Sequence, residues 1–93
     1  MNATETGPQF LANELERLIA LPVKTDDDVA LWNKEARALE ASLLERFSNF
    51  AYLHDVTHFL DDADIRQRDS GYRDSQHERM SKYIAQLRAD ASV

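Results

Sequence analysis

Apolar residues recur in this sequence at intervals of three and four positions along most of its length. That interval matches the turn of an α-helix, which places such residues on one face. Only two glycines and two prolines interrupt the chain, and we find no convincing run in which apolar and polar residues alternate. The sequence therefore predicts an all-α fold, a small up-and-down bundle of three to four helices.

Start and stop signals give the expected helix boundaries. Pro8 suits a first helical turn, because its missing N–H would have no partner there. Thr25 is followed by three aspartates, a pattern typical of a helix start, since the hydroxyl caps a free amide and the carboxylates face the positive end of the helix dipole. Asp69, Ser70 and Gly71 form the expected turn before the last helix, where the glycine can adopt a positive φ at little cost. These signals predict helices at about 8–21, 26–48, 50–68 and 72–90.

An apolar seam in the second predicted helix continues in nearly heptad register into the third. Its members are Val29, Trp32, Ala36, Leu39, Leu43, Phe50, Leu53 and Leu60. The two helices are continuous if this register holds throughout. We expect a break or kink near Ser48-Asn49, because both residues offer side-chain hydrogen bonds that compete with the helical backbone.

The length of 93 residues has room for one domain, residues 1–93, with a short flexible N-terminus over about 1–7. A chain of this size buries only roughly 60 to 65% of the surface that it exposes when unfolded, so its core is thin. A protein partner, or a second copy in a homodimer, would help to complete that core.

The balance of charge and the absence of cysteine exclude several classes of function. With 17 acidic and 11 basic residues the formal charge is −6, which repels a phosphate backbone, so we expect no nucleic-acid partner. No cysteine is available for disulfides or thiolate metal sites. No apolar stretch approaches the roughly 18 residues of a membrane span, and residues 1–9 lack the features of a signal peptide. We therefore expect no membrane association and a cytoplasmic location.

Two histidines four residues apart, with an aspartate beside the first, form the sharpest chemical motif, His-Asp-x-x-His. On a helix His54 and His58 lie one above the other and can share a divalent cation, to which Asp61 or Asp62 would add an oxygen ligand. The motif resembles the His-Glu-x-x-His helix of zinc metalloproteases, but Asp55 stands where that family has its catalytic glutamate. Alternatively, both histidines are half-buried polar residues that border the apolar seam.

No other pattern supports catalysis. The serines lack the flanking glycines of known nucleophile turns, and no glycine-rich loop is present to hold a phosphate. The sequence therefore favours a protein that is not an enzyme and that has no cofactor apart from a divalent metal at the histidine pair.

Charge is distributed unevenly along the chain. Residues 1–65 hold 13 acidic and 5 basic side chains, whereas residues 66–88 hold 3 acidic and 6 basic ones. Basic residues of the second segment, among them Arg66, Arg73 and Arg79, suit contact with an acidic partner or a phosphate, because guanidinium groups form paired hydrogen bonds with such anions. Alternatively, they neutralise nearby aspartates of the third predicted helix.

A second apolar stripe, with spacings of four, three and four, runs beside the seam through Tyr52, Val56, Phe59 and Ala63. Its simplest interpretation is core packing. Alternatively, Tyr52 and Phe59 form part of a face that a partner helix or a second subunit covers.

These features favour a small acidic helical protein-interaction module, an adaptor or a regulatory protein that acts by surface contact. Two alternatives stay open. One is a metal-binding helical protein that uses His54 and His58 with Asp61 or Asp62. The other is an acidic inhibitor or immunity-type protein that neutralises a basic partner.

Overall fold

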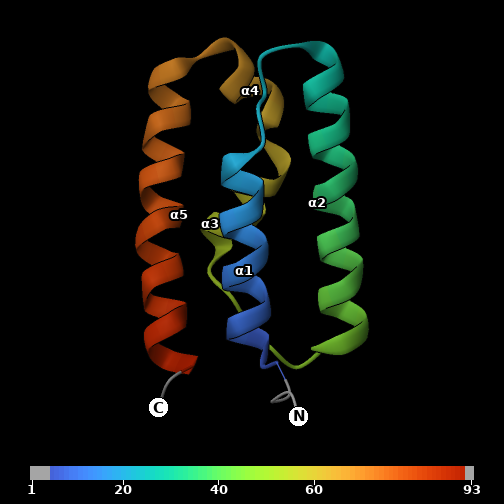
Figure 1. The fold of residues 1–93 in the computed structure, drawn as a ribbon, viewed down its shortest axis with the longest axis vertical. Coiled ribbons are helices and arrows are strands. Elements are labelled where there is room, and N and C mark those ends of the chain that lie inside the picture. Colours follow the sequence, from blue (N-terminus) through green and yellow to red (C-terminus); the bar gives the residue numbers. More distant parts are fainter. Residues whose placement is uncertain (1–4, 92–93) are drawn as a thin grey trace.

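Four rods run alternately up and down in the structure, which is a computed structural model (Figure 1). α1 (Gly7–Ala20) runs up and α2 (Asp26–Arg46) runs down. Two short helices, α3 (His54–Asp61) and α4 (Ala63–Arg68), then run up as one broken rod, and α5 (Ser70–Ala91) runs down beside α1. No strand occurs in the part of the chain that the structure describes, and the predicted all-α, up-and-down bundle is confirmed.

The structure describes residues 5–91, so the first four positions of the segment predicted to be flexible, residues 1–7, lie outside it. The end of that segment is ordered instead. Thr6 caps α1, and Gly7 is the first residue of the helix and is buried.

Both long helices at the start of the chain begin with a capping box. The Thr6 hydroxyl accepts a hydrogen bond from the amide of Gln9, and the Gln9 side chain accepts one from the amide of Thr6. Thr25 and Asp28 form the same reciprocal pair at the start of α2. Such caps satisfy amides that have no partner within the helix, so the predicted start at Thr25 is confirmed.

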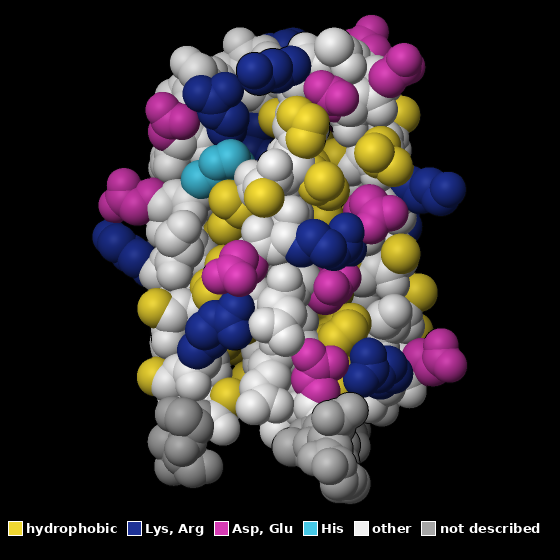
Figure 2. Space-filling view, viewed as in Figure 1, with side chains coloured by type: hydrophobic (Ala, Val, Ile, Leu, Met, Phe, Trp, Pro, Cys, Tyr) yellow, Lys and Arg dark blue, Asp and Glu magenta, His cyan; other side chains and the backbone are white. Residues whose placement is uncertain are grey.

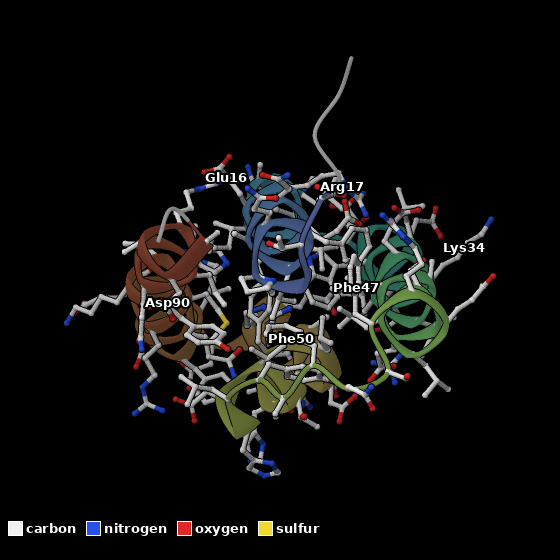
Figure 3. The ribbon with its side chains drawn as sticks, turned by 90° about the horizontal axis from the view of Figure 1, so that it is seen from below. Glu16, Arg17, Lys34, Phe47, Phe50 and Asp90 are labelled. Carbon is white, nitrogen blue, oxygen red and sulfur yellow. The ribbon has the colours of Figure 1, made fainter. Side chains whose placement is uncertain are left out.

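The helical backbone ends at Phe47, so the predicted break near Ser48-Asn49 is confirmed and a continuous helix across it is wrong. Arg46, the last residue of α2, places its guanidinium 4.7 Å from the ring centroid of Phe10 and 5.0 Å from that of Phe47. Phe50 lies toward the centre of the bundle at its lower end (Figure 3). These aromatic contacts close the bottom of the bundle where the chain reverses.

The heptad register of the predicted seam does not continue past this reversal. Trp32 and Leu43 are buried as predicted, whereas Leu53 is 48% exposed. The expected helix 50–68 is also wrong in its start and its continuity, because it begins at His54 and is interrupted at Asp62.

Gly71 does not occupy a turn, in contrast to the prediction. Asp69 alone links α4 and α5, and its carboxylate accepts a hydrogen bond from the amide of Tyr72 at 3.0 Å, as a helix cap does. Ser70 and Gly71 are therefore the first residues of α5, and no glycine among residues 5–91 has a positive φ.

One apolar cluster, to which α1, α2, the α3–α4 rod and α5 all contribute, fills the interior. Trp32 is its largest fully buried side chain, and its indole N–H donates to the Leu18 carbonyl at 3.0 Å. The cluster contains Phe10, Leu11, Ala12, Leu15, Leu18, Val23, Val29, Trp32, Ala36, Leu39, Leu43, Val56, Phe59, Leu60, Ala63, Met80, Tyr83, Ile84 and Leu87.

The outer surfaces of the helices carry charged side chains. Glu16, Arg17 and Lys34 lie on the outside of the bundle (Figure 3). Arg17 donates hydrogen bonds to Glu14 and to Glu35. These bonds, that to Glu14 most, raise the pKa of its guanidinium above its ordinary value. Within residues 5–91, each helix is too short or too polar to cross a lipid bilayer.

The two glycines of the chain provide a matched test of this fold. Gly71→Ala is expected to stabilise the protein by up to about 1 kcal/mol, because alanine favours the helix and the added Cβ would meet only the Asp69 carboxylate, at 3.4 Å. Gly7→Ala would place its Cβ 2.9 Å from Cγ of Phe50, so we expect a loss of about 1 kcal/mol or more. Urea unfolding measures both free energies. A loss in Gly71→Ala would contradict its helical placement.

Candidate functional site

A charged side chain, Arg66, lies inside the apolar cluster with only 1% of its surface exposed. Its guanidinium carbon is 4.4 Å from the ring centroid of Trp32 on α2 and 4.4 Å from that of Phe59 on α3. Its Nη1 donates to the Phe59 carbonyl at 2.7 Å and to Oε1 of Gln76 on α5 at 2.6 Å. The two rings stabilise the cation from its faces, and the two oxygens satisfy one of its nitrogens.

Burial alters the electrostatics of Arg66. The loss of solvent lowers the pKa of its guanidinium to about 10, although the charge of Asp62 opposes that shift. The side chain is therefore protonated at neutral pH. Its Nε and Nη2 are buried without a hydrogen-bond partner in the described structure, so this buried cation is only partly compensated.

Gln76 connects Arg66 to a polar group nearer the surface. Its Nε2 donates to the Tyr72 hydroxyl at 3.0 Å and to Oδ2 of Asp62 at 3.3 Å. The Tyr72 hydroxyl itself donates to the Asp62 carboxylate, and this bond raises the pKa of Tyr72 above its usual value. Asp62 is the residue at which the third rod breaks, so these bonds fix the break against the first turns of α5.

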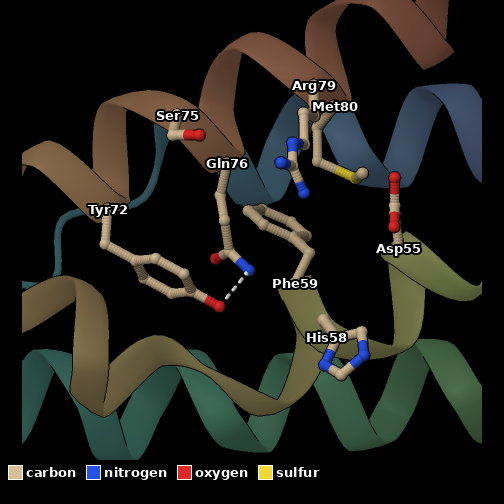
Figure 4. A pocket seen from close by; sticks show the side chains of 8 residues that line it. All are labelled: Asp55, His58, Phe59, Tyr72, Ser75, Gln76, Arg79 and Met80. Carbon is tan, nitrogen blue, oxygen red and sulfur yellow. Dashed lines mark hydrogen bonds between the residues drawn. The ribbon is translucent and has the colours of Figure 1, made fainter.

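A groove between α3 and α5 lies next to this polar group and encloses a cavity of about 350 Å³. Figure 4 shows Phe59 and Gln76 near its middle, with Tyr72 at one end and Asp55 near Met80 at the other. The remaining lining residues are His58, Ser75 and Arg79. The groove thus combines an apolar floor with charged and hydrogen-bonding margins.

A second hollow, of about 290 Å³, continues along the same side of α5. Leu53, Tyr83 and Leu87 are among the residues that line it. The Tyr83 hydroxyl accepts a hydrogen bond from the amide of Leu53 at 3.2 Å, which joins two residues of the hollow across its width.

Two of the five residues predicted to contact a partner lie in the interior. Phe59 is fully buried and Arg66 is 1% exposed, so contact with a partner would have to occur through the cavities that they line, the groove for Phe59 and the cavity shared with Arg73 for Arg66. Both lie on the face of the third rod that packs against Trp32. Tyr52 lines the second hollow and Arg79 lines the groove, whereas Arg73 lines a different cavity. Partner contact at all five residues stays a prediction.

The histidine pair adopts the geometry that its spacing predicts. The rings of His54 and His58 lie 4.7 Å apart, edge to face, and both residues are exposed rather than half-buried. Asp61 forms an ion pair with Arg37 at 2.9 Å, and Asp62 belongs to the hydrogen-bonded group described above. No group of three or more His, Cys, Asp or Glu side chains in residues 5–91 is arranged to hold a metal ion. Metal binding at this pair stays a prediction.

The groove offers surface contact and hydrogen bonds. Ser75 is its only serine, and no hydrogen bond joins that hydroxyl to a histidine or a carboxylate in the described residues. Without such a base a serine hydroxyl is a weak nucleophile. Polar groups beside an apolar floor suit the binding of a side chain from another molecule.

Comparisons of this chain with protein-family models, with curated proteins and with solved structures found no match. Its function is therefore inferred from its own residues.

Tyr72 and Gln76 are the residues of this site that the sequence analysis missed. They lie four positions apart on α5, and Met80 follows after four more. This spacing continues the buried stripe of α5 toward its start, with polar residues in place of apolar ones. A helical stripe that turns polar at one end is the signal that indicates such a site.

Removal of the Asp62 charge should change how Tyr72 titrates. In Asp62→Asn we expect the pKa of Tyr72 to fall back toward its ordinary value of 10.0, because the hydrogen bond that raises it comes from the Asp62 carboxylate. Absorbance of the phenolate measures this shift, and Tyr72→Phe identifies the signal. Asp61→Asn is the matched control, since Asp61 pairs with Arg37.

The same bond predicts a pH effect on stability. Because the pKa of Tyr72 is raised in the folded state, the contribution of this bond is complete below pH 10 and is lost as the pH rises through the raised value. The unfolding free energy of the native protein should therefore fall more steeply at alkaline pH than that of Asp62→Asn. An unchanged Tyr72 titration in Asp62→Asn would contradict the assignment.

Proposed function

We propose that this chain is a protein-interaction module whose groove between α3 and α5, with the second hollow beside it, binds a helical segment of a partner protein. The observation that carries this proposal is the alignment of the two hollows along one face of α5. The α5 residues that line them are Tyr72, Ser75, Gln76, Arg79 and Met80, followed by Tyr83, Gln86, Leu87 and Asp90. Each of these residues follows the one before it by one or three positions, which keeps them all on a single face of the helix.

The dimensions suit a helix. From Tyr72 to Asp90 the lined face is roughly 27 Å long at about 1.5 Å per residue, the length of a helix of about 18 residues. Gln76, in the groove, and Leu87, in the second hollow, are roughly 16 Å apart along the axis by the same measure. A helix that lies along α5 would therefore insert one anchoring side chain into each hollow, about 11 residues apart.

The charge of the chain favours a basic partner. The formal charge is −6, and an acidic side chain lines each hollow, Asp55 in the groove and Asp90 in the second hollow. Arg79 is the one basic residue of the α5 face and would pair with an acidic side chain of the bound helix. An apolar helix with a net positive charge fits these margins best.

An exposed leucine at the second hollow reinforces the proposal. Leu53 is 48% exposed and lies beside half-buried Tyr52. Apolar side chains that border a hollow are typical anchoring points of protein interfaces. Adaptor, regulatory and inhibitory roles all use such a surface, and they differ in whether the activity of the partner changes on binding.

A matched pair of leucine variants tests this proposal. Leu53→Asp adds a charge at the second hollow, whereas Leu31→Asp adds the same charge on α2, where Leu31 is 52% exposed and lines neither hollow. Proteins captured from the source cell by the native chain are identified and then purified. We expect Leu53→Asp to weaken the affinity for the partner by about tenfold or more and Leu31→Asp to leave it within about twofold.

Further measurements separate this proposal from the alternatives. Affinity for a basic partner should decrease as salt is added. Sedimentation tests the homodimer, which Leu53→Asp should dissociate if the helix is supplied by a second copy. A partner that Leu31→Asp releases and Leu53→Asp retains would contradict the groove as the binding surface.

A further inference from the structure

A third cavity, of about 330 Å³, lies at the end of the bundle away from the second hollow, where the connection between α1 and α2 meets α4 and α5. Two kinds of residue line it. The end of α1 and the connection supply the apolar residues Ile19, Ala20, Leu21, Pro22 and Val23, and the connection also supplies Lys24. The polar residues Arg66, Gln67, Arg73 and His77 come from α4 and α5. Figure 2 shows basic side chains and a histidine gathered over this end of α5.

Among residues 5–91, no carboxylate lines this cavity. Two acidic residues lie nearby. Asp74, which follows Arg73 directly in α5, forms an ion pair with it at 3.3 Å. Asp26 accepts a hydrogen bond from Gln67 at 3.0 Å. Lys24 has no ion pair within residues 5–91. Within the lining itself, the three positive side chains Lys24, Arg66 and Arg73 therefore have no negative side chain among them.

Arg66 forms part of the wall of this cavity. Its positive charge is only partly offset by hydrogen bonds within the core. Its Nε and Nη2 are buried without a partner in the described structure. The charges of Asp62 and Asp64 act on Arg66, but neither residue lines the cavity, so an anion there would place a negative charge at the wall itself.

His77 is half-buried between these cations. The loss of solvent lowers the pKa of His77, and the charges of Arg66 and Arg73 lower it further, while Asp74 opposes the shift. Its ring also contacts Phe59, with centroids 6.3 Å apart. The imidazole is therefore neutral at neutral pH and can donate a hydrogen bond to an anion without a charge of its own.

We propose that this cavity binds a small phosphate monoester with an apolar group, its phosphate between Lys24, Arg73 and Arg66 and its apolar part against Leu21, Pro22 and Val23. A dianionic phosphate matches these cations better than one carboxylate, since it offers more charge and more acceptor oxygens. The inference concerns a different surface from the groove and does not depend on the proposed function.

Phenyl phosphate is a suitable probe, compared with inorganic phosphate and with phenol. Calorimetry measures the affinity, and the ring proton of His77 in a nuclear magnetic resonance spectrum reports the place of binding, assigned with His77→Gln. The test variant is Lys24→Gln with Arg73→Gln. The control is Lys34→Gln with Lys82→Gln, which removes the same charge from exposed positions outside this cavity. Helix content and unfolding temperature show that both variants fold.

We expect phenyl phosphate to bind, to shift the His77 signal and to bind more tightly than inorganic phosphate or phenol. The test variant should lose about tenfold or more in affinity, and the control should stay within about twofold. Equal losses in the two variants would overturn the proposal, because they would indicate attraction to overall charge alone. Absence of binding at millimolar phenyl phosphate, or a shift of His58 without His77, would also overturn it.

Discussion

The burial of one guanidinium determines how the third rod packs in this bundle. Arg66 lies between the rings of Trp32 and Phe59 and donates to oxygens on α3 and α5. It therefore contacts three of the four rods from inside the core. Removal of a charge from water costs several kcal/mol unless rings and acceptors offset it, so the positions of these partners are tightly constrained.

The groove between α3 and α5 and the cavity beside His77 both depend on how Arg66 is placed. Because Gln76 Oε1 accepts from Arg66, its amide nitrogen is directed to Tyr72 and Asp62, which sets the polar end of the groove. On the other side Arg66 forms part of the cationic wall of the cavity beside His77. One buried residue thus connects the two cavities beside the first turns of α5 that we propose as binding sites.

Much of the fold could be predicted from local signals in the sequence, and the site could be predicted only in part. Helical spacing, the cap at Thr25 and the break after α2 are short-range effects that one segment contains by itself. Gly71 was placed in a turn because its sequence suits one, yet Asp69 alone caps α5. Burial of Arg66 depends on rings from two other helices, and no local pattern shows those. One signal did exist, since Arg66 lies three residues after Ala63 and so continues the apolar stripe of the third rod.

A double-mutant cycle on Arg66 and Gln76 measures this buried interaction directly. By urea unfolding we expect Arg66→Met and Gln76→Leu each to lose about 2 to 4 kcal/mol, because each leaves a buried polar group without its partner. The double variant should lose less than the sum of the two by at least about 1 kcal/mol. Arg68→Met, at an exposed position two residues along α4, should change the stability by less than about 0.5 kcal/mol. Additive losses in the double variant, or a loss in Arg66→Met as small as that of Arg68→Met, would contradict the role assigned to the buried guanidinium.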